Sequence, residues 1–228
     1  MASKPQTTRT LGATTFTKAI KPGPVFNNYG VDVSKKWAQE RIQNEVTALQ
    51  FIAANTTIPV PRFLDTGIGE NGPYLTVQRV DGIELTNVAK ECRHQTVNCT
   101  ACQAIANQNT TTFIKTIVLP QLAALKSNQS GLNGLVIPPP WVTEEDRRAT
   151  WPSKMSATAE FEFWHGDLGG HNIMCDRDTL QVICLFDWEN AGYYPPEFKL
   201  WSVDWPGFDA LFTDKNRLAK LIRLLEPY

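Results

Sequence analysis

The sequence predicts an α+β chain of two lobes, with a small N-terminal lobe of β-sheet and one helix and a mainly helical C-terminal lobe. Strand patterns and one helical pattern come first in the chain, and helical patterns and a short hairpin follow. The turn Asp81-Gly82 separates them, so we expect residues 1–82 to form the first lobe and residues 83–228 the second. A chain of 228 residues is long enough for a sizeable core.

The first lobe is predicted to hold one helix and three extended segments. Alternation or the presence of prolines, which disfavour helix, predicts the extended segments at residues 14–21, 58–64 and 74–80. Residues 67–72 are rich in glycine and predict a turn. The helix is expected over residues 35–54, where apolar residues recur at helical spacing. This stripe consists of Ile42, Val46, Leu49 and Ala53.

The second lobe is predicted to begin with a polar stretch, residues 83–108, that has no clear pattern. A helix is expected over residues 112–126, with a bend at Pro120. Its apolar side would carry Phe113, Ile117, Leu122 and Leu125. Further along, a loop, a strand, a hairpin and a last helix are expected at residues 127–140, 161–164, 173–186 and 214–225.

Composition and charge exclude several classes of protein. The chain is 42% apolar and 20% charged, as in soluble globular proteins, and carries a net charge of −1. We therefore expect no nucleic-acid partner and no membrane partner. The N-terminal segment lacks the apolar core of a signal peptide, so we expect a cytoplasmic protein. The sequence does not indicate an oligomeric state.

The cysteines favour the same compartment, because their number, five, is odd. Three of them, Cys92, Cys99 and Cys102, cluster in the chain with His94 nearby. A zinc site would need all four side chains to converge, and no second CxxC motif exists. We therefore interpret them as thiols of a linker.

The segment His-Gly-Asp-Leu-Gly-Gly-His-Asn, residues 165–172, places chemically useful side chains on one loop. Asp167 could accept the proton of a substrate hydroxyl, as the catalytic base of a phosphoryl transfer. Asn172 could offer an amide oxygen to Mg²⁺. Asp187 ends an apolar run, where a charge is unfavourable unless a partner such as Mg²⁺ awaits it. We expect His165 to act as a structural hydrogen-bonding residue.

A cation for the phosphates of ATP is expected from the first strand. Alternation places Lys18 on the inward face with Phe16 and Ile20, whereas Lys21 falls on the other face. The matching anion is Glu45, which borders the apolar stripe of the helix.

An alternative for the helix is a solvated Glu45 paired with Arg41 across one turn. The order of the elements also places Gln78 and Val80 at the hinge between the lobes, where backbone groups can pair with adenine.

Six stretches of the chain resemble the aminoglycoside phosphotransferase and choline kinase-like family, and most closely its small fungal members. They are residues 16–21, 41–52, 58–61, 74–82, 165–173 and 186–198. The resemblance implies a protein-kinase-like fold and an ATP-dependent phosphotransferase that uses Mg²⁺. It also implies Asp167 as base, Asn172 and Asp187 as metal ligands, and Lys18 with Glu45 at the phosphates. Trp188-Glu189 after Asp187 favours a small-molecule hydroxyl acceptor over a protein.

Two other functions remain open from the sequence. Gly12 is the only glycine before Lys18, and the segment after Asp187 is short for this family, so the chain could instead be a non-catalytic nucleotide-binding accessory protein. A metal-dependent hydrolase could use His165, Asp167 and His171, but it would leave Lys18 and Glu45 unexplained.

Overall fold

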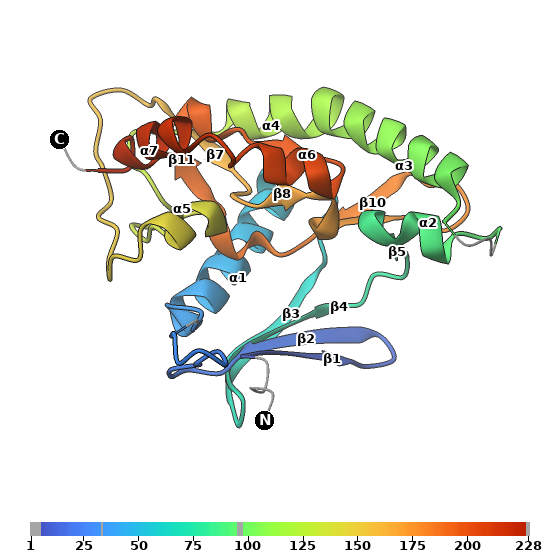
Figure 1. Ribbon diagram of the computed structural model, residues 1–228, viewed down its shortest axis with the longest axis horizontal. Coiled ribbons are helices and arrows are strands. Elements are labelled where there is room, and N and C mark those ends of the chain that lie inside the picture. Colours follow the sequence, from blue (N-terminus) through green and yellow to red (C-terminus); the bar gives the residue numbers. More distant parts are fainter. Residues whose placement is uncertain (1–5, 33, 95–97, 227–228) are drawn as a thin grey trace.

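The computed structural model describes residues 6–32, 34–94 and 98–226. Residues 1–5, part of the segment predicted to lack a signal peptide, lie outside these ranges. A β-sheet with one helix forms the lower part of the molecule, and a mainly helical part lies above it (Figure 1). The α+β fold predicted from the sequence is confirmed. The lobe boundary at residue 82 stays a prediction.

The lower part is a four-stranded antiparallel sheet with the order β1-β2-β4-β3. Its strands are β1 (Thr7–Leu11), β2 (Thr15–Ile20), β3 (Phe63–Gly69) and β4 (Gly72–Gln78). β1 was not predicted, and most of its residues are exposed at the edge of the sheet. The turn predicted over residues 67–72 is wrong in extent, because β3 continues to Gly69 and only residues 70 and 71 form the turn.

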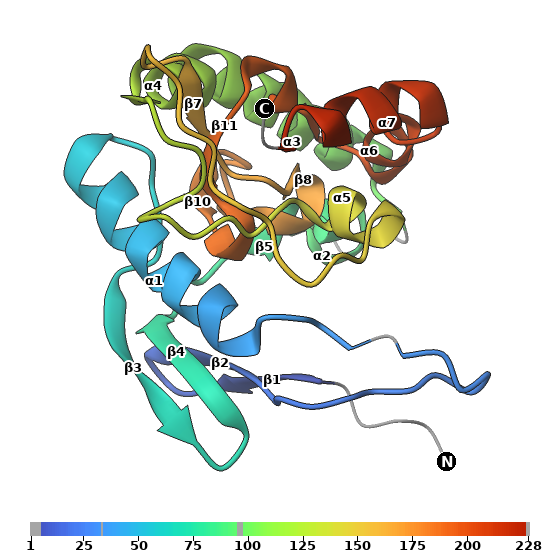
Figure 2. The same cartoon turned by 90° about the vertical axis from the view of Figure 1, so that its left-hand side faces the viewer.

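Helix α1 (Ala38–Asn55) lies between this sheet and the upper part of the molecule (Figure 2). It starts three residues later than predicted, since Trp37 has a left-handed backbone with φ of 58°. Ile42 and Leu49 are buried as expected, but Ala53 is exposed. Because α1 has neighbours on two sides, its buried residues form more than one stripe and include three polar ones: Arg41, Asn44 and Glu45.

The upper part contains short helices and one long helical run, which lies across the top of Figure 1. The elements up to this run are η1 (Leu85–Asn87), α2 (Val88–Glu91), α3 (Thr100–Phe113), the π-helix η2 (Ile114–Val118) and α4 (Leu119–Ala124). The later helices are α5 (Pro140–Glu145), η3 (Gly170–Asn172), η4 (Trp188–Asn190), η5 (Pro196–Phe198), α6 (Trp205–Ala210) and α7 (Lys215–Arg223). The last helix was predicted almost to the residue.

The run from α3 to α4 buries one residue in every four. These residues are Cys102, Ala106, Thr110, Ile114, Val118 and Leu122. In an α-helix of 3.6 residues per turn, a spacing of four drifts by about 40° at each step. The wider π-helical turns of η2, just before Pro120, reverse part of this drift and keep the residues on one side. The predicted apolar side was therefore wrong: among its four members only Leu122 is fully buried.

Short strands in the upper part flank the segments that carry Asp167, Asn172 and Asp187. The first two small sheets have the orders β10-β9-β5 and β11-β7-β6, and the third pairs β12 with β8. Their strands are β5 (Ile83–Glu84), β6 (Lys126–Ser127), β7 (Phe161–Trp164), β8 (Leu168–Gly169), β9 (Ile173–Cys175), β10 (Val182–Leu185), β11 (Gly192–Tyr194) and β12 (Trp201–Ser202). The predicted strand at 161–164 and the predicted hairpin, β9 with β10, are confirmed.

No helix in the described part of the chain is both long and apolar enough to cross a membrane.

The buried face of the long helical run generates a matched test. Ile114→Ala should lower the free energy of unfolding by about 2–5 kcal/mol, because Ile114 is fully buried and its truncation leaves a cavity. Ile105→Ala, on α3 but 51% exposed, should change it by less than about 0.5 kcal/mol. Urea unfolding measures both. Equal effects of the two substitutions would contradict the buried face described above.

Candidate active site

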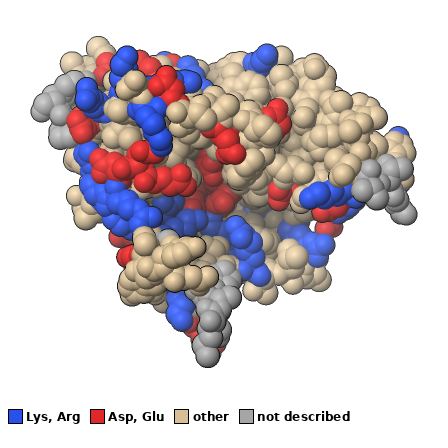
Figure 3. All heavy atoms as spheres, in the orientation of Figure 1, with Lys and Arg blue, Asp and Glu red and all other residues tan. Residues whose placement is uncertain are grey.

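A cavity of about 580 Å³ lies between the sheet and the upper part of the molecule. Charged side chains of both signs gather along the hollow between the two parts (Figure 3). The residues predicted to contact nucleotide, phosphate or metal all line this cavity: Lys18, Glu45, Gln78, Val80, Asn172 and Asp187. Asp167 is not among its lining residues but contacts one of them, Asn172.

The ammonium group of Lys18 is the centre of the site. It donates to Glu45 Oε2 at 2.7 Å and also to Asp187 Oδ1, and it lies 2.6 Å from Glu189 Oε2. Lys18 is only 3% exposed. The predicted pairing of Lys18 with Glu45 is thus present. Lys35 forms a further ion pair with Glu189 from the outer side.

A second set of contacts joins α1 to the residues after Asp187. Arg41 Nη1 donates to Glu189 Oε1 at 2.9 Å and to Asn190 Oδ1 at 3.2 Å. Asn44 Nδ2 donates to the carbonyls of Glu189 and Ala191 at 3.0 and 2.8 Å. The alternative in which Arg41 pairs with a solvated Glu45 is therefore wrong. The sequence did not predict the ion pairs of Glu189, which follows Asp187 by two positions.

Burial and charge act against each other in this cluster. Burial by itself would lower the pKa of Lys18, but the three surrounding carboxylates, Asp187 above all, raise it well above its ordinary value. Burial, with help from the other carboxylates, raises the pKa of Glu45 to about 7. For Glu189 burial is outweighed by the surrounding cations, Lys18 first, which lower its pKa. The site therefore holds a permanently charged amine among carboxylates.

Asp167 lies on the loop between β7 and η3, where three side chains meet. Asn172 Nδ2 donates to the main-chain oxygen of Asp167 at 2.8 Å and to its Oδ2 at 3.2 Å. His171 Nε2 lies 3.3 Å from the same Oδ2. Burial would lower the pKa of His171, but the hydrogen bond and charge of Asp167 raise it. One carboxylate oxygen of Asp167 thus has two neighbours that fix its position.

His165 ties this loop to the strand end that carries Asp187. Its Nδ1 accepts from the main-chain N–H of Asp167 at 3.3 Å, and its Nε2 donates to the carbonyl of Phe186 at 3.0 Å. The ring packs against Trp188 in a tilted arrangement, with 4.4 Å between centroids. Burial lowers the pKa of His165 and favours its neutral form. His165 therefore has the structural hydrogen-bonding role expected from the sequence.

The oxygen ligands that Asn172 and Asp187 offer at the cavity fit a hard divalent cation. Asn172 lines the cavity, and Asp167 holds its amide nitrogen, so Oδ1 is the amide atom that remains for a metal ion. Asp187 contributes a carboxylate from a left-handed backbone with φ of 64°, a conformation that aspartate tolerates better than most residues. Carboxylate and amide oxygens are ligands that Mg²⁺ prefers.

The family of the chain follows from a comparison with family models. The model described as the phosphotransferase enzyme family matches residues 32–214, most of the chain and all of the site except Lys18. The chain belongs to this phosphotransferase family. The phosphotransferase family that the resemblance indicated is thereby confirmed. No curated protein is similar enough in sequence to count as a match.

The solved structures that match this chain include other phosphotransferases. An aminoglycoside-3'-phosphotransferase of type VIII has 17% identity and a TM-score of 0.47, with 97% of this chain and 93% of that one covered. The aminoglycoside phosphotransferase APH(3'')-Id from Streptomyces rimosus has 14% identity and a TM-score of 0.48, with coverages of 95% and 83%.

A third similar structure is WbdD, solved with a kinase inhibitor. It has 14% identity and a TM-score of 0.45. The match covers 82% of this chain but 31% of WbdD. At such similarity these proteins give no information on the substrate of this family member.

The buried charge network predicts a strong effect of Glu189→Gln. This substitution leaves Arg41 and Lys18 buried with one counter-charge fewer, so it should lower the free energy of unfolding by about 3–5 kcal/mol. Glu226→Gln removes a carboxylate that pairs with Arg148 at the surface and should cost at most about 1 kcal/mol. Urea unfolding at pH 7 compares them. A loss for Glu189→Gln as small as the control would show that the network does not stabilise the fold.

The two histidines of the loop should give stability opposite dependences on pH. The folded-state pKa of His165 is lowered, so its contribution is present above about pH 6.5, the ordinary value, and is lost as the pH falls. The pKa of His171 is raised, so its contribution is present at low pH and lost as the pH rises.

Urea unfolding between pH 5 and 8 in metal-free buffer checks both signs. The stability difference between the wild type and His165→Gln should shrink as the pH falls. The difference between the wild type and His171→Gln should grow over the same interval. Parallel curves for the two variants would contradict the environments described above.

Proposed function

We propose that this family member transfers the γ-phosphoryl group of ATP to a hydroxyl of a small molecule. One observation carries the proposal. Lys18, Glu45, Asn172 and Asp187 line the same cavity, although they come from four separate segments of the chain. Asp167 contacts Asn172 directly at the edge of this group. This is the set of roles that phosphoryl transfer needs: a cation for the phosphates, metal ligands and a base.

Lys18 would contact the phosphates of the nucleotide. Its ammonium is held by Glu45 on one side and has Asp187 on the other, so it can point into the cavity without rearrangement of β2 or α1. Phosphate oxygens would offer the amine a negative partner in place of Asp187, whose carboxylate would hold the metal ion. The pair with Glu45 keeps the amine in place throughout.

Asn172 and Asp187 would hold Mg²⁺ through Oδ1 and a carboxylate oxygen. When bound, this ion neutralises charge on the phosphates. Asp167 would accept the proton of the acceptor hydroxyl. Its orientation is fixed by the amide of Asn172, and His171 lies beside the same oxygen. Base and metal ligand are thus joined by a direct hydrogen bond.

The adenine would pair with the segment that follows β4. The main-chain N–H of Gln78 already donates to the carbonyl of Arg62 at 2.8 Å, so Gln78 has less to offer than the sequence suggested. Val80 follows the end of β4 and also lines the cavity, and we assign the backbone contacts with adenine to it. In place of a glycine-rich loop, β1 and β2 are joined by a short turn at Gly12, with Arg9 and Leu11 facing the cavity.

A non-catalytic nucleotide-binding protein is the second candidate. The turn at Gly12 between β1 and β2 favours this candidate. It has a single glycine and offers fewer backbone groups to phosphates than a glycine-rich loop does. The hydrolase alternative is contradicted, because both ring nitrogens of His165 are hydrogen-bonded to the main chain in a fully buried position.

Three substitutions separate the two candidates by binding and turnover. Asp187→Asn should abolish the Mg²⁺-dependent part of the thermal stabilisation by ATP, because it removes the charged ligand while asparagine tolerates the left-handed backbone. Asp167→Asn should keep this stabilisation but lower turnover by about 10²–10⁴-fold. Asp178→Asn, at the exposed tip of the β9–β10 hairpin, serves as the matched control and should change neither.

The measurements are thermal shift with ATP and Mg²⁺, and phosphate transfer to a panel of aminoglycosides, sugars and amino alcohols. Stabilisation without any turnover in the wild type would support the non-catalytic protein. A wild type that ATP and Mg²⁺ do not stabilise would overturn both candidates.

A further inference from the structure

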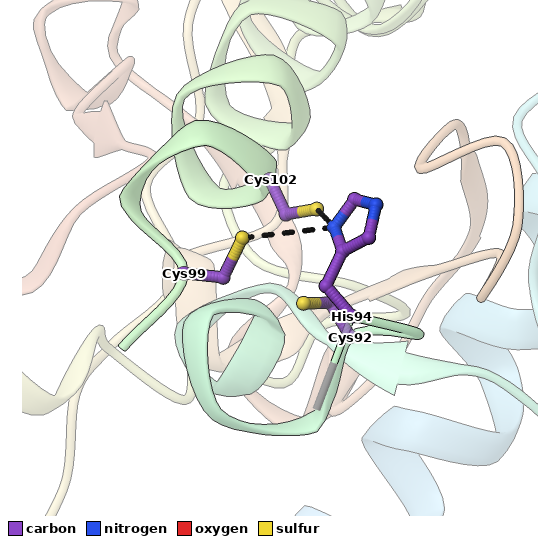
Figure 4. A group of neighbouring side chains, drawn as sticks. All are labelled: Cys92, His94, Cys99 and Cys102. Carbon is purple, nitrogen blue, oxygen red and sulfur yellow. Dashed lines mark hydrogen bonds between the residues drawn. The ribbon is translucent and has the colours of Figure 1, made fainter. Parts of the chain in front are cut away.

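A second group of side chains, which is not part of the cavity lining, converges between the end of α2 and the start of α3. The ligand atoms of Cys92, His94, Cys99 and Cys102 all lie within 4.8 Å of one another. Figure 4 shows the His94 ring turned toward the sulfurs of Cys99 and Cys102, with Cys92 on the neighbouring helix end. The condition set by the sequence for a metal site, convergence of all four, is met.

The ligand atoms are close enough together to bind one tetrahedral zinc ion after small adjustments. Zinc bonds of about 2.3 Å to sulfur and about 2.0 Å to nitrogen, at tetrahedral angles, place neighbouring ligand atoms about 3.5–3.8 Å apart. His94 Nδ1 lies 3.1 Å from Cys102 Sγ and 3.8 Å from Cys99 Sγ. These values bracket the expected separation.

We infer that Cys92, His94, Cys99 and Cys102 bind one zinc ion. Three thiolates and one imidazole make up a ligand set of structural zinc sites, in which all four positions are filled by protein. Soft thiolate ligands also exclude Mg²⁺ and Ca²⁺, which prefer oxygen. The ion would have no open position for a substrate, so its role is structural.

The backbone holds the thiols in place without the metal. Cys92 ends α2, and its N–H donates to the carbonyl of Val88 at 3.1 Å. Cys99 precedes α3, and its N–H donates to the carbonyl of Ala89 at 2.8 Å. Cys102 is 3% exposed, as the first residue of the buried face of α3. Three ligands are therefore largely preformed, and the exposed ring of His94 can close the site from outside.

The position of the site suggests what the ion does. It would fasten the end of α2 to the start of α3, directly after η1. η1 packs against η3, the short helix that contains Asn172. A disulfide would use only two of the three sulfurs, and the structure holds all the cysteines as thiols.

Zinc content of the full-length, tag-free protein tests the inference. Protein purified with a reducing agent and without chelator should contain about one equivalent of zinc per chain. Cys92→Ser and Cys102→Ser should lose it, whereas Cys175→Ala, a buried thiol outside the cluster, should retain it. Removal of zinc by a strong chelator should lower the melting temperature of the wild type by about 5 °C or more and leave Cys102→Ser unchanged.

Substitutions of His94, the exposed ligand, test zinc binding in variants whose buried residues are unchanged. His94→Ala should weaken zinc binding at least about 10-fold, and His94→Cys should restore it as a four-thiolate site. With Co²⁺ in place of zinc, both the wild type and His94→Cys should show the absorption bands of tetrahedral cobalt, with stronger sulfur charge transfer in His94→Cys. Zinc-free protein that does not take up added zinc, or a disulfide between two of the three cysteines, would overturn the inference.

Discussion

An ammonium group buried among carboxylates is the interaction on which this structure depends. Lys18 comes from the sheet and Glu45 from α1, while Asp187 and Glu189 come from the segment after β10. A buried charge is stable only with its partners in place, so these groups also fix how the sheet, its helix and the upper part meet. Arg41 completes the connection through Glu189. Contacts that shape the cavity therefore also join the sheet and α1 to the upper part of the molecule.

The sequence was sufficient wherever one segment carried the signal. Alternation along β2 placed Lys18 inward, and the spacing within one loop brought out Asp167 and Asn172. The contact of Arg41 with Glu189 joins residues 148 positions apart, so no local pattern announces it. A local rule, pairing across one helical turn, even suggested a wrong partner for Arg41. Such contacts become visible only when the tertiary structure brings the segments together.

Two of the elements that the sequence did not predict, α3 and β1, have residues that hide the usual pattern. α3 buries Cys102, Ala106 and Thr110, which are small or polar and form no apolar stripe in the sequence. β1 lies at the edge of the sheet with mostly exposed residues, so burial imposes no alternation on it. The convergence of the cysteine cluster was not predicted for a similar reason. Its motifs are short and weak along the chain, and their meaning depends on how the helix ends meet.

The π-helical segment between α3 and α4 makes the length of this helix a fixed quantity. Loss of a single residue there would turn everything beyond it by about 100° about the helix axis. Leu122 would then leave the core, while Cys102 at the other end would stay where it is. Insertions and deletions along this helix are therefore expected to disrupt its buried face. The wider π-helical turns of η2 thus keep the buried residues of α3 and those of α4 on the same side of the helix.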